Sequence, residues 1–234
     1  MPHTLRAFKI LEFDPNHYDF RRAVAELFAV EAGSDVVSAL SSYTPEKSAF
    51  GYEYAKNLRV KMMRDGESLL VGYEALIKDI IAPMMLAEYE TKEATILYQY
   101  PPTLRVFPSL SPPKALGRLH TDYDYGHQNG EINFWLPIVN IGGDNASLWS
   151  ERTQGAKDFY PFCLKYGEIQ RFHGVSLMHG TYPNDGGKTR ISLDFRVALE
   201  ESFQSGYSHP NRKVKFKHEM KRLSYSRKVE DANH

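Results

Sequence analysis

Three side chains in the middle of the chain are of the types that together bind a ferrous ion. His120 and Asp122 are separated by one residue in RLHTDYDY, and His179 follows in GVSLMHGTYPN. Two histidines and one carboxylate form the facial triad that suits non-haem Fe(II) and leaves coordination positions open. Alternate residues of a strand point to the same side, so we predict a strand over residues 118–122 that directs His120 and Asp122 at one ion.

An arginine and a serine that follow His179 are suited to an anionic ligand. Arg190 and Ser192 lie in TRISLDFRV, at plus 11 and plus 13 from His179. A guanidinium pairs bidentately with a carboxylate, and a hydroxyl on the same face adds a hydrogen bond. We expect this pair to hold the distal carboxylate of 2-oxoglutarate while its oxo-acid end chelates the iron. Without such a pair, His120 is more simply an ordinary hydrogen-bonded histidine.

Further polar and aromatic residues are candidates for the lining of the same site. Asn133 is expected to bond the 2-oxoglutarate carboxylate at the iron end or the substrate, and a structural hydrogen bond is the alternative. Four residues are candidate substrate contacts: Trp135, Arg118, Arg196 and Trp149. For Arg196 the alternative is a salt bridge with Asp194 or Glu131, and for Trp149 it is a place in the core.

Other residues near the motif are weaker candidates. His127 and Asp124 could be alternative metal ligands, but they fall in a glycine-containing loop, DYDYGHQNG. We expect His173 to be structural. Tyr123 and Tyr125 are candidates for part of a lid.

The order of these motifs resembles a known superfamily. His120, Asp122, His179, Arg190 and Ser192 together look like the Fe(II)/2-oxoglutarate-dependent dioxygenases of the phytanoyl-CoA hydroxylase type. The stretches LHTDYDYGHQNGEINFWLPI and MHGTYPNDGGKTRISLDFRV are similar to the streptomycin-biosynthesis oxygenase-like (StrG-like) branch. The resemblance covers roughly residues 93–200.

The resemblance implies a fold and a working set of cofactors. The fold would be α+β, with a double-stranded β-helix (jelly-roll, cupin-like) core and N-terminal helices on one sheet. Iron, 2-oxoglutarate and O2 would be used, and succinate and CO2 released. Related halogenases replace the iron carboxylate by a small residue; since Asp122 is present, the resemblance implies hydroxylation, desaturation or ring formation instead.

The periodicity of the chain changes near residue 92. Residues 14–31 and 67–89 carry apolar residues at helical spacing, with Asp14 or Asn16 as a candidate N-cap of the first helix and Pro83 expected to end or kink the second. Six later runs alternate as strands do: ATILYQY, ALGRLHT, EINFWLPIV, ASLWSE, EIQRF and RISLDFRV. We therefore predict one domain, with a helical part at 1–92, the jelly-roll core at 93–200 and a basic extension at 201–234.

Composition and charge limit the choice of partners. Lys+Arg and Asp+Glu both number 29 in the 234 residues, which gives no bulk charge for a nucleic acid or a membrane. No long apolar run predicts a signal peptide or a membrane span, and the single cysteine, Cys163, favours a cytoplasmic setting. The basic tail over residues 211–228 is expected to be a solvated helix or a partly disordered extension. A small polar molecule, such as an amino acid, a sugar or a natural-product intermediate, is the expected substrate, and the oligomeric state is left open, with a homodimer as one option.

Three other functions stay open at this point. A cupin-like metalloenzyme would not need Arg190 and Ser192 where they are. A binding or sensor protein could keep the barrel without turnover. An adaptor could act through the basic tail.

Overall fold

The chain combines a layer of helices with antiparallel sheets. The computed structural model describes residues 8–31, 33–43, 52–109, 118–143, 146–207 and 219–227. The helices are α2 (Phe20–Leu27), α3 (Val36–Ser42), α4 (Tyr52–Asp65), α5 (Glu67–Leu76), the π-helical turn η1 (Ile77–Ile81), α6 (Ala82–Glu88) and the 3₁₀ turns η2 (Asp122–Tyr125) and η3 (Glu200–Ser202). Within the described ranges, no helix is both long and apolar enough to cross a membrane.

The strands form one large sheet and two small ones. The large sheet has the order β1-β9-β4-β11-β2-β12, and β3 pairs with the first half of β11. Its strands are β1 (Lys9–Glu12), β2 (Glu93–Tyr100), β3 (Thr103–Phe107), β4 (Ile132–Pro137), β9 (Glu168–Phe172), β11 (Arg190–Leu199) and β12 (Glu219–Ser226). The small sheets contain β10 (His179–Gly180), β6 (Trp149–Glu151) and β7 (Phe159–Pro161), and β5 (Ile141–Gly142) with β8 (Cys163–Leu164). The expected α+β class is confirmed.

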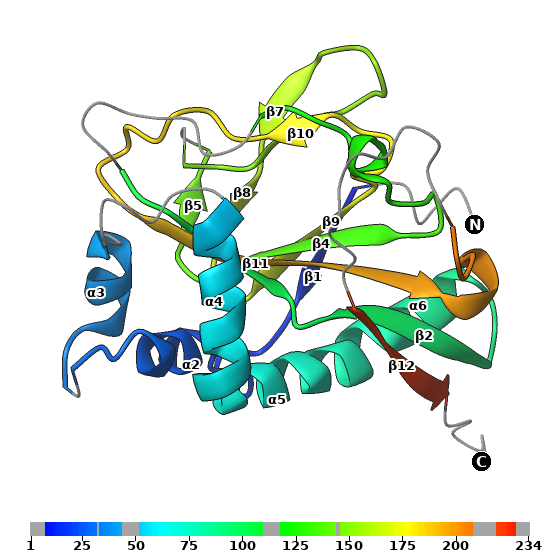
Figure 1. The fold of residues 1–234 in the computed structure, drawn as a ribbon, viewed down its shortest axis with the longest axis horizontal. Coiled ribbons are helices and arrows are strands. Elements are labelled where there is room, and N and C mark those ends of the chain that lie inside the picture. Colours follow the sequence, from blue (N-terminus) through cyan, green and yellow to red (C-terminus); the bar gives the residue numbers. More distant parts are fainter. Residues whose placement is uncertain are drawn as a thin grey trace, which may run out of the picture.

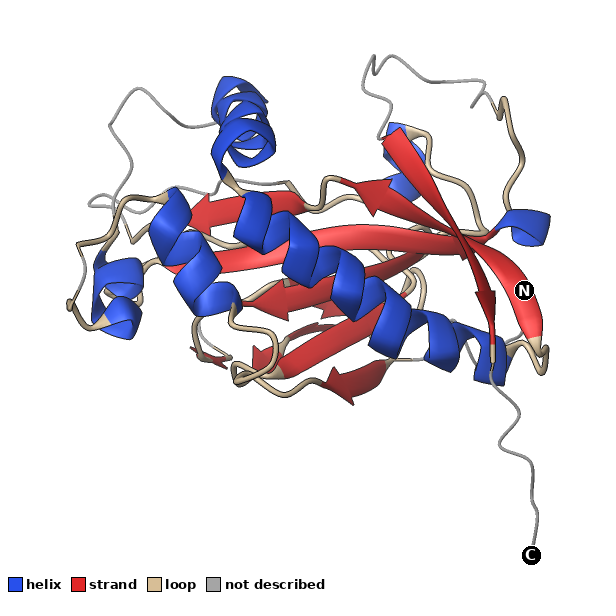
Figure 2. Cartoon of the chain, turned by 90° about the horizontal axis from the view of Figure 1, so that it is seen from below, coloured by secondary structure: helices blue, strands red, loops and turns tan. Residues whose placement is uncertain are grey.

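Helices cover one face of the large sheet, and the small sheets lie on its other side. Figure 1 shows α5 below β11 and β7 and β10 above it, and Figure 2 shows the helices in front of the sheet when it is seen from below. The core lies between helices and sheet. There Phe195 stacks on Phe134 at 5.4 Å between ring centroids and meets Tyr73 edge-on at 5.0 Å.

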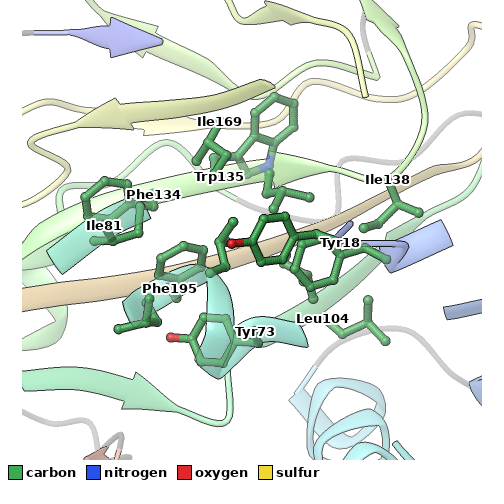
Figure 3. Close-up of a cluster of buried hydrophobic side chains, with 14 of the residues drawn as sticks. Tyr18, Tyr73, Ile81, Leu104, Phe134, Trp135, Ile138, Ile169 and Phe195 are labelled. Atoms are coloured by element: carbon green, nitrogen blue, oxygen red, sulfur yellow. The ribbon is translucent and has the colours of Figure 1, made fainter. Parts of the chain in front are cut away.

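The alternation of β4 sends neighbouring residues to different surroundings. In Figure 3, Trp135 stands on the side of β4 away from Tyr73 and Phe195. Full burial of a large apolar side chain such as Phe134 stabilises the fold by roughly 1.5–3 kcal/mol. Packing on the helix side therefore fixes the register of β4, and with it the direction in which Asn133 and Trp135 point.

The two predicted helices exist with different bounds. The first begins at Phe20 and not near residue 14, because Asp19 is its N-cap and accepts a hydrogen bond from the Arg22 backbone. Asp14 is used in a preceding turn, where its side chain accepts from the Asn16 backbone. Asp14 and Asn16 were thus the wrong caps.

The second predicted helix does not end at Pro83. Helical backbone continues to Glu88, and the π-helical turn at residues 77–81 comes directly before the proline. A proline has no N–H to donate to the preceding turn, and a π-turn shifts the hydrogen-bond pattern where that donor is missing. The apolar stripe of this helix is buried as expected, with Tyr73, Leu76 and Ile77 fully inside.

Two strands come from parts of the chain that we expected to be helical or irregular. β1 lies in the predicted helical part and pairs with β9, while β12 lies in the basic tail and pairs with β2 along its whole length. The prediction of a solvated helix or a disordered extension is wrong for residues 219–226, and residues 208–218 and 228–234 lie outside the described ranges. The sheet therefore extends beyond the predicted core of 93–200.

Candidate metal and cofactor site

The three predicted metal ligands meet at one point. One potential ligand atom each from His120, Asp122 and His179 lies within 4.8 Å of the other two. The Nε2 atoms of His120 and His179 are each 3.7 Å from Oδ1 of Asp122. Asp122 and His179 are buried, and His120 is partly exposed. The sequence spacing thus selected side chains that the fold brings together.

The backbone that carries His120 and Asp122 differs from the expected strand. His120 forms only a single bridge with His179, through a pair of backbone hydrogen bonds of 3.0 and 2.9 Å. Asp122 opens the 3₁₀ turn η2, whose N-cap Thr121 forms a capping box with Asp124. The predicted strand over 118–122 is therefore wrong, as is its extension ALGRLHT within the described residues, and residues 115–117 lie outside them.

Both imidazole rings are held in the tautomer that binds a metal. Nδ1 of His120 lies 2.7 Å from the Arg118 carbonyl oxygen, and Nδ1 of His179 lies 2.9 Å from that of Leu177. A carbonyl oxygen only accepts, so each Nδ1 carries the proton and each Nε2 keeps its lone pair. Burial, with the positive charge of Arg196, outweighs the attraction of Asp122 and lowers the pKa of His179 to about 4. His179 is therefore neutral near pH 7, as a metal ligand must be.

Asp122 is held as a carboxylate although it is 1% exposed. Burial favours its protonated form, but the charge of Arg196, the electrostatic effect of His179 and His127, and a hydrogen bond from Asn133 hold its pKa well below the ordinary value. Arg196 contacts Asp122 at 2.9 Å, and Asn133 donates to it at 2.6 Å. Arg196 is thus paired with the candidate metal ligand. Asp194 pairs with Arg105 and Glu131 with His127, so the salt bridges first considered for Arg196 are not those the structure forms.

A cavity of about 380 Å³ opens over these residues. His120 and His179 line it together with the candidate residues Asn133, Trp135, Arg190 and Arg196. Its apolar wall includes Leu58, Leu104, Phe107, Leu148 and Phe172. Arg118 and Trp149 are not among the lining residues: the Arg118 side chain is exposed, and Trp149 contacts Tyr182 edge-on at 5.1 Å.

Arg190 is buried in the cavity wall between two aromatic rings. Its guanidinium carbon lies 4.8 Å from the centre of the Phe107 ring and 5.8 Å from that of Trp135. One of its nitrogens donates to the Ala146 carbonyl at 2.8 Å. A buried guanidinium in a cavity wall is suited to pair with the carboxylate of a bound anion.

Two buried hydroxyls of this region lack partners. Oγ of Ser192 and Oγ1 of Thr181 have no hydrogen-bond partner among the residues that the structure describes. Thr181 lines the cavity, whereas Ser192 is not among the lining residues and lies two residues from Arg190 on the same face of β11. A buried hydroxyl without a partner costs about 1–3 kcal/mol, so a bound polar ligand would gain from both.

The remaining candidates have other roles in the structure. His127 is bonded to Glu131 at 2.7 Å, Asp124 caps η2, and both nitrogens of His173 are hydrogen-bonded, to Ser176 and to the Asn129 carbonyl. The structural role expected for His173 is confirmed. Tyr123 and Tyr125 are 45% and 41% exposed, and Tyr125 meets the His120 ring edge-on.

Some residues of the site were not found from the sequence. Phe107 and Arg105 lie on β3. The alternation of this strand, TLRVF, is too short to have predicted it. Gln99, which accepts from Arg196 at 3.1 Å, lies on the predicted strand β2 and could have been found by asking which polar residues interrupt its apolar face. Thr181 stands two residues after His179 and carries no signal of its own.

The fold of the chain is shared with a solved structure. The structure of EctD from S. alaskensis with 2-oxoglutarate and 5-hydroxyectoine matches with a TM-score of 0.54 at 12% identity, over 86% of this chain and 74% of that one. AviO1 from Streptomyces viridochromogenes Tue57 matches with a TM-score of 0.49 at 14% identity, over 86% of this chain and 93% of that one. No protein-family model matches the sequence.

A related sequence is also known. The streptomycin biosynthesis protein StrG of Streptomyces griseus is 35% identical over 103 residues, which are 44% of this chain and 47% of that protein. The match thus spans about half the length of this relative. The resemblance to StrG that the motifs indicated is confirmed over these 103 residues.

Proposed function

We propose that this chain is a non-haem Fe(II)- and 2-oxoglutarate-dependent oxygenase with a double-stranded β-helix core. The observation that carries the proposal is the convergence of His120 Nε2, His179 Nε2 and Asp122 Oδ1, with both imidazoles held in the metal-binding tautomer. Two neutral imidazoles and one carboxylate are the donor set of the facial triad. These three residues would hold the iron.

The anion site in the same cavity supports 2-oxoglutarate as the cofactor. Arg190 would pair with its distal carboxylate, and the buried hydroxyl of Ser192 would donate to the same group. EctD, which shares the fold, was solved with 2-oxoglutarate, and this is consistent with the proposal. Asn133 already bonds Asp122 and the Gly174 backbone with its two polar side-chain atoms, which favours a structural role over a cofactor contact.

The residues around the site would position the reactants and limit water. Bound iron and 2-oxoglutarate would supply the activation of O2, with succinate and CO2 as co-products. The chain holds the two imidazoles and the carboxylate in place, and the apolar wall with Phe107 and Phe172 keeps water from the reacting groups. With Asp122 present, we propose hydroxylation or a related oxidation and not halogenation.

The size of the cavity favours a small substrate. A volume of about 380 Å³ falls within the range of small-molecule pockets, and Arg105 and Asp194 add polar groups to a wall that is otherwise largely apolar. We therefore propose a small polar molecule as substrate and a cytoplasmic setting. StrG takes its name from the biosynthesis of a natural product, and this is consistent with a natural-product intermediate.

Anaerobic titration of the protein with Fe(II) and 2-oxoglutarate tests the proposal. We expect the weak visible charge-transfer band of an oxo acid chelated to ferrous iron, and we expect the Asp122→Ala variant to lack it. Binding of Fe(II) without this band would favour the cupin-like metalloenzyme over a 2-oxoglutarate enzyme. If the folded protein binds no divalent metal at all, the proposal is wrong.

A further inference from the structure

The two oxygens of Asp122 lie in different environments. Oδ1 faces the Nε2 atoms of both histidines at 3.7 Å. Oδ2 faces away from them and is surrounded by donors: two nitrogens of Arg196 at 2.9 Å each and Nδ2 of Asn133 at 2.6 Å. An oxygen that accepts from three N–H groups, two of them charged, has no free lone pair to offer a metal.

Asn133 and Gly174 close a ring of hydrogen bonds around Asp122. Asn133 Oδ1 accepts from the Gly174 N–H at 3.0 Å, and the Gly174 carbonyl accepts from the Asp122 N–H at 2.8 Å. The side chain of Asp122, through Asn133, and its backbone are thus both tied to Gly174. A Cβ atom at residue 174 would lie 2.9 Å from three side-chain atoms of Asn133, so only glycine fits there without displacing the amide.

The Arg196 side chain is also held by a hydrogen bond on the side away from Asp122. It is 7% exposed, and Nη1 donates to Oε1 of Gln99 at 3.1 Å. Gln99 in turn donates to Oγ1 of Thr103 at 2.9 Å. Since β2 and β11 are paired neighbours in the large sheet, the guanidinium is held by the sheet and not by a mobile loop.

We propose that Arg196, Asn133 and Gly174 form a carboxylate clamp that makes Asp122 a one-oxygen ligand of the metal. The inference rests on the proposed function and adds three positioning residues to it. Coordination by both oxygens would require Oδ2 to give up its charge-assisted hydrogen bonds, which are the strongest kind in proteins. One-oxygen binding leaves the ion the open positions that a bidentate oxo acid and O2 require.

Titration with Co(II) in the absence of 2-oxoglutarate measures the clamp directly, because the visible absorption of Co(II) responds to its coordination number. The test variants are Arg196→Lys, which keeps the charge but not the two adjacent donors, and Asn133→Ala. We expect each to weaken Co(II) binding by about 10–100-fold, the usual effect of losing a group that orients a metal ligand, and to change the Co(II) spectrum.

Matched controls separate the clamp from general damage to the fold. Arg171→Lys changes another buried arginine, which pairs with Glu88 at 2.7 Å and lies outside the cavity lining. Gly174→Ala should behave like Asn133→Ala, since the new methyl group would displace the amide. Gly142→Ala is its control, because a Cβ there meets no atom within 4 Å. Both controls should retain the wild-type Co(II) affinity and spectrum.

The outcomes distinguish this inference from the function on which it rests. If the wild-type protein binds neither Co(II) nor Fe(II), the proposed function fails and the clamp fails with it. If the wild-type protein binds Co(II), and Arg196→Lys, Asn133→Ala and Gly174→Ala bind it with the same affinity and spectrum, the clamp alone is overturned. Should Arg196→Lys fail to fold, Asn133→Ala and Gly174→Ala decide the matter, since neither alters the buried ion pair of Arg196 with Asp122.

Discussion

The two ends of the cavity differ in how far the protein itself satisfies their polar atoms. At the metal end, Oδ2 of Asp122 accepts from Arg196 and Asn133, and the Nδ1 atoms of both histidines donate to carbonyls. At the Arg190 end, the hydroxyl of Ser192, two residues from Arg190 on the same face of β11, is buried without a hydrogen-bond partner in the described part of the chain.

Because of this difference, we expect the stability of the Arg190 end to depend on a bound ligand more than that of the metal end does. A fully bonded network is rigid and holds its geometry before the ligand arrives. Buried hydroxyls without partners destabilise the free protein by about 1–3 kcal/mol each, and a ligand that bonds them recovers part of that energy. We therefore expect substitutions at the metal end to affect both folding and binding, and substitutions at the Arg190 end to affect ligand binding above all.

The largest effect is expected for Asp122→Asn. The asparagine side chain lacks the negative charge that would pair with both the metal and Arg196. We therefore expect Fe(II) affinity to fall by more than the ~10–100-fold that is typical when a residue that orients a metal ligand is lost. Arg196 would be left as a buried charge without its partner, which costs about 3–5 kcal/mol of unfolding free energy. Metal titration and urea denaturation measure the two effects.

Asp194→Asn is the matched control for that experiment. Asp194 also lines the cavity and pairs with an arginine, but the partner Arg105 is half exposed, so less stability depends on the pair. We expect this variant to keep its metal affinity. Equal loss of metal binding in both variants would mean that the charge of the cavity matters and that Asp122 is not a specific ligand.

A smaller and more selective effect is expected for Arg190→Gln. Hydrogen bonds to charged groups contribute about 1.5–3 kcal/mol, which corresponds to a loss of roughly 10–100-fold in affinity for 2-oxoglutarate. Binding of Fe(II) alone should be unchanged, because Arg190 packs against Phe107 and Trp135 and donates to the Ala146 carbonyl. Isothermal titration with 2-oxoglutarate in the presence of a divalent metal measures the effect.

Lys188→Gln provides the control for charge alone. Lys188 is exposed and lies two residues from Arg190. The Lys188→Gln substitution therefore changes the net charge of the region by the same amount as Arg190→Gln. We expect its 2-oxoglutarate affinity to stay within about twofold of the wild type, since an exposed charge is well screened. If Arg190→Gln binds 2-oxoglutarate as tightly as the wild type does, Arg190 is not part of the cofactor site.

The same contrast explains what could be predicted from the sequence. The metal ligands and Arg190 were found because their chemistry restricts residue type and spacing, and β9 and β11 because their alternation is clear. The strand under His120 and Asp122 was wrong, because Thr121 and Asp124 form a local capping box that competes with strand pairing. Alternation alone could not reveal that competition.

Contacts between segments that are distant in the sequence could not be predicted from local sequence patterns. β1 and β12 are edge strands that are recognised by their pairing with β9 and β2, far away in the chain. The partner of Arg196 was missed for a similar reason, because Asp122 approaches it only once η2 turns its carboxylate toward β11. Local sequence constrains which side chains share a face, but the turn decides which of them meet.

The smallest effect, and the most specific to the contrast between the two ends, is expected for Ser192→Ala. Removing a buried hydroxyl without a partner should leave the unfolding free energy of the ligand-free protein unchanged or raise it by up to ~1 kcal/mol, while lowering the affinity for 2-oxoglutarate by about 2–10-fold. Ser150→Ala is the matched case, since Ser150 is equally buried but donates to the Glu151 carbonyl at 3.1 Å, and it should lose about 1 kcal/mol. Urea denaturation with and without 2-oxoglutarate and a divalent metal compares the two variants. If Ser192→Ala loses as much stability as Ser150→Ala in the absence of ligand, then the Ser192 hydroxyl is already satisfied within the protein, and the contrast between the bonded metal end and the open Arg190 end does not hold.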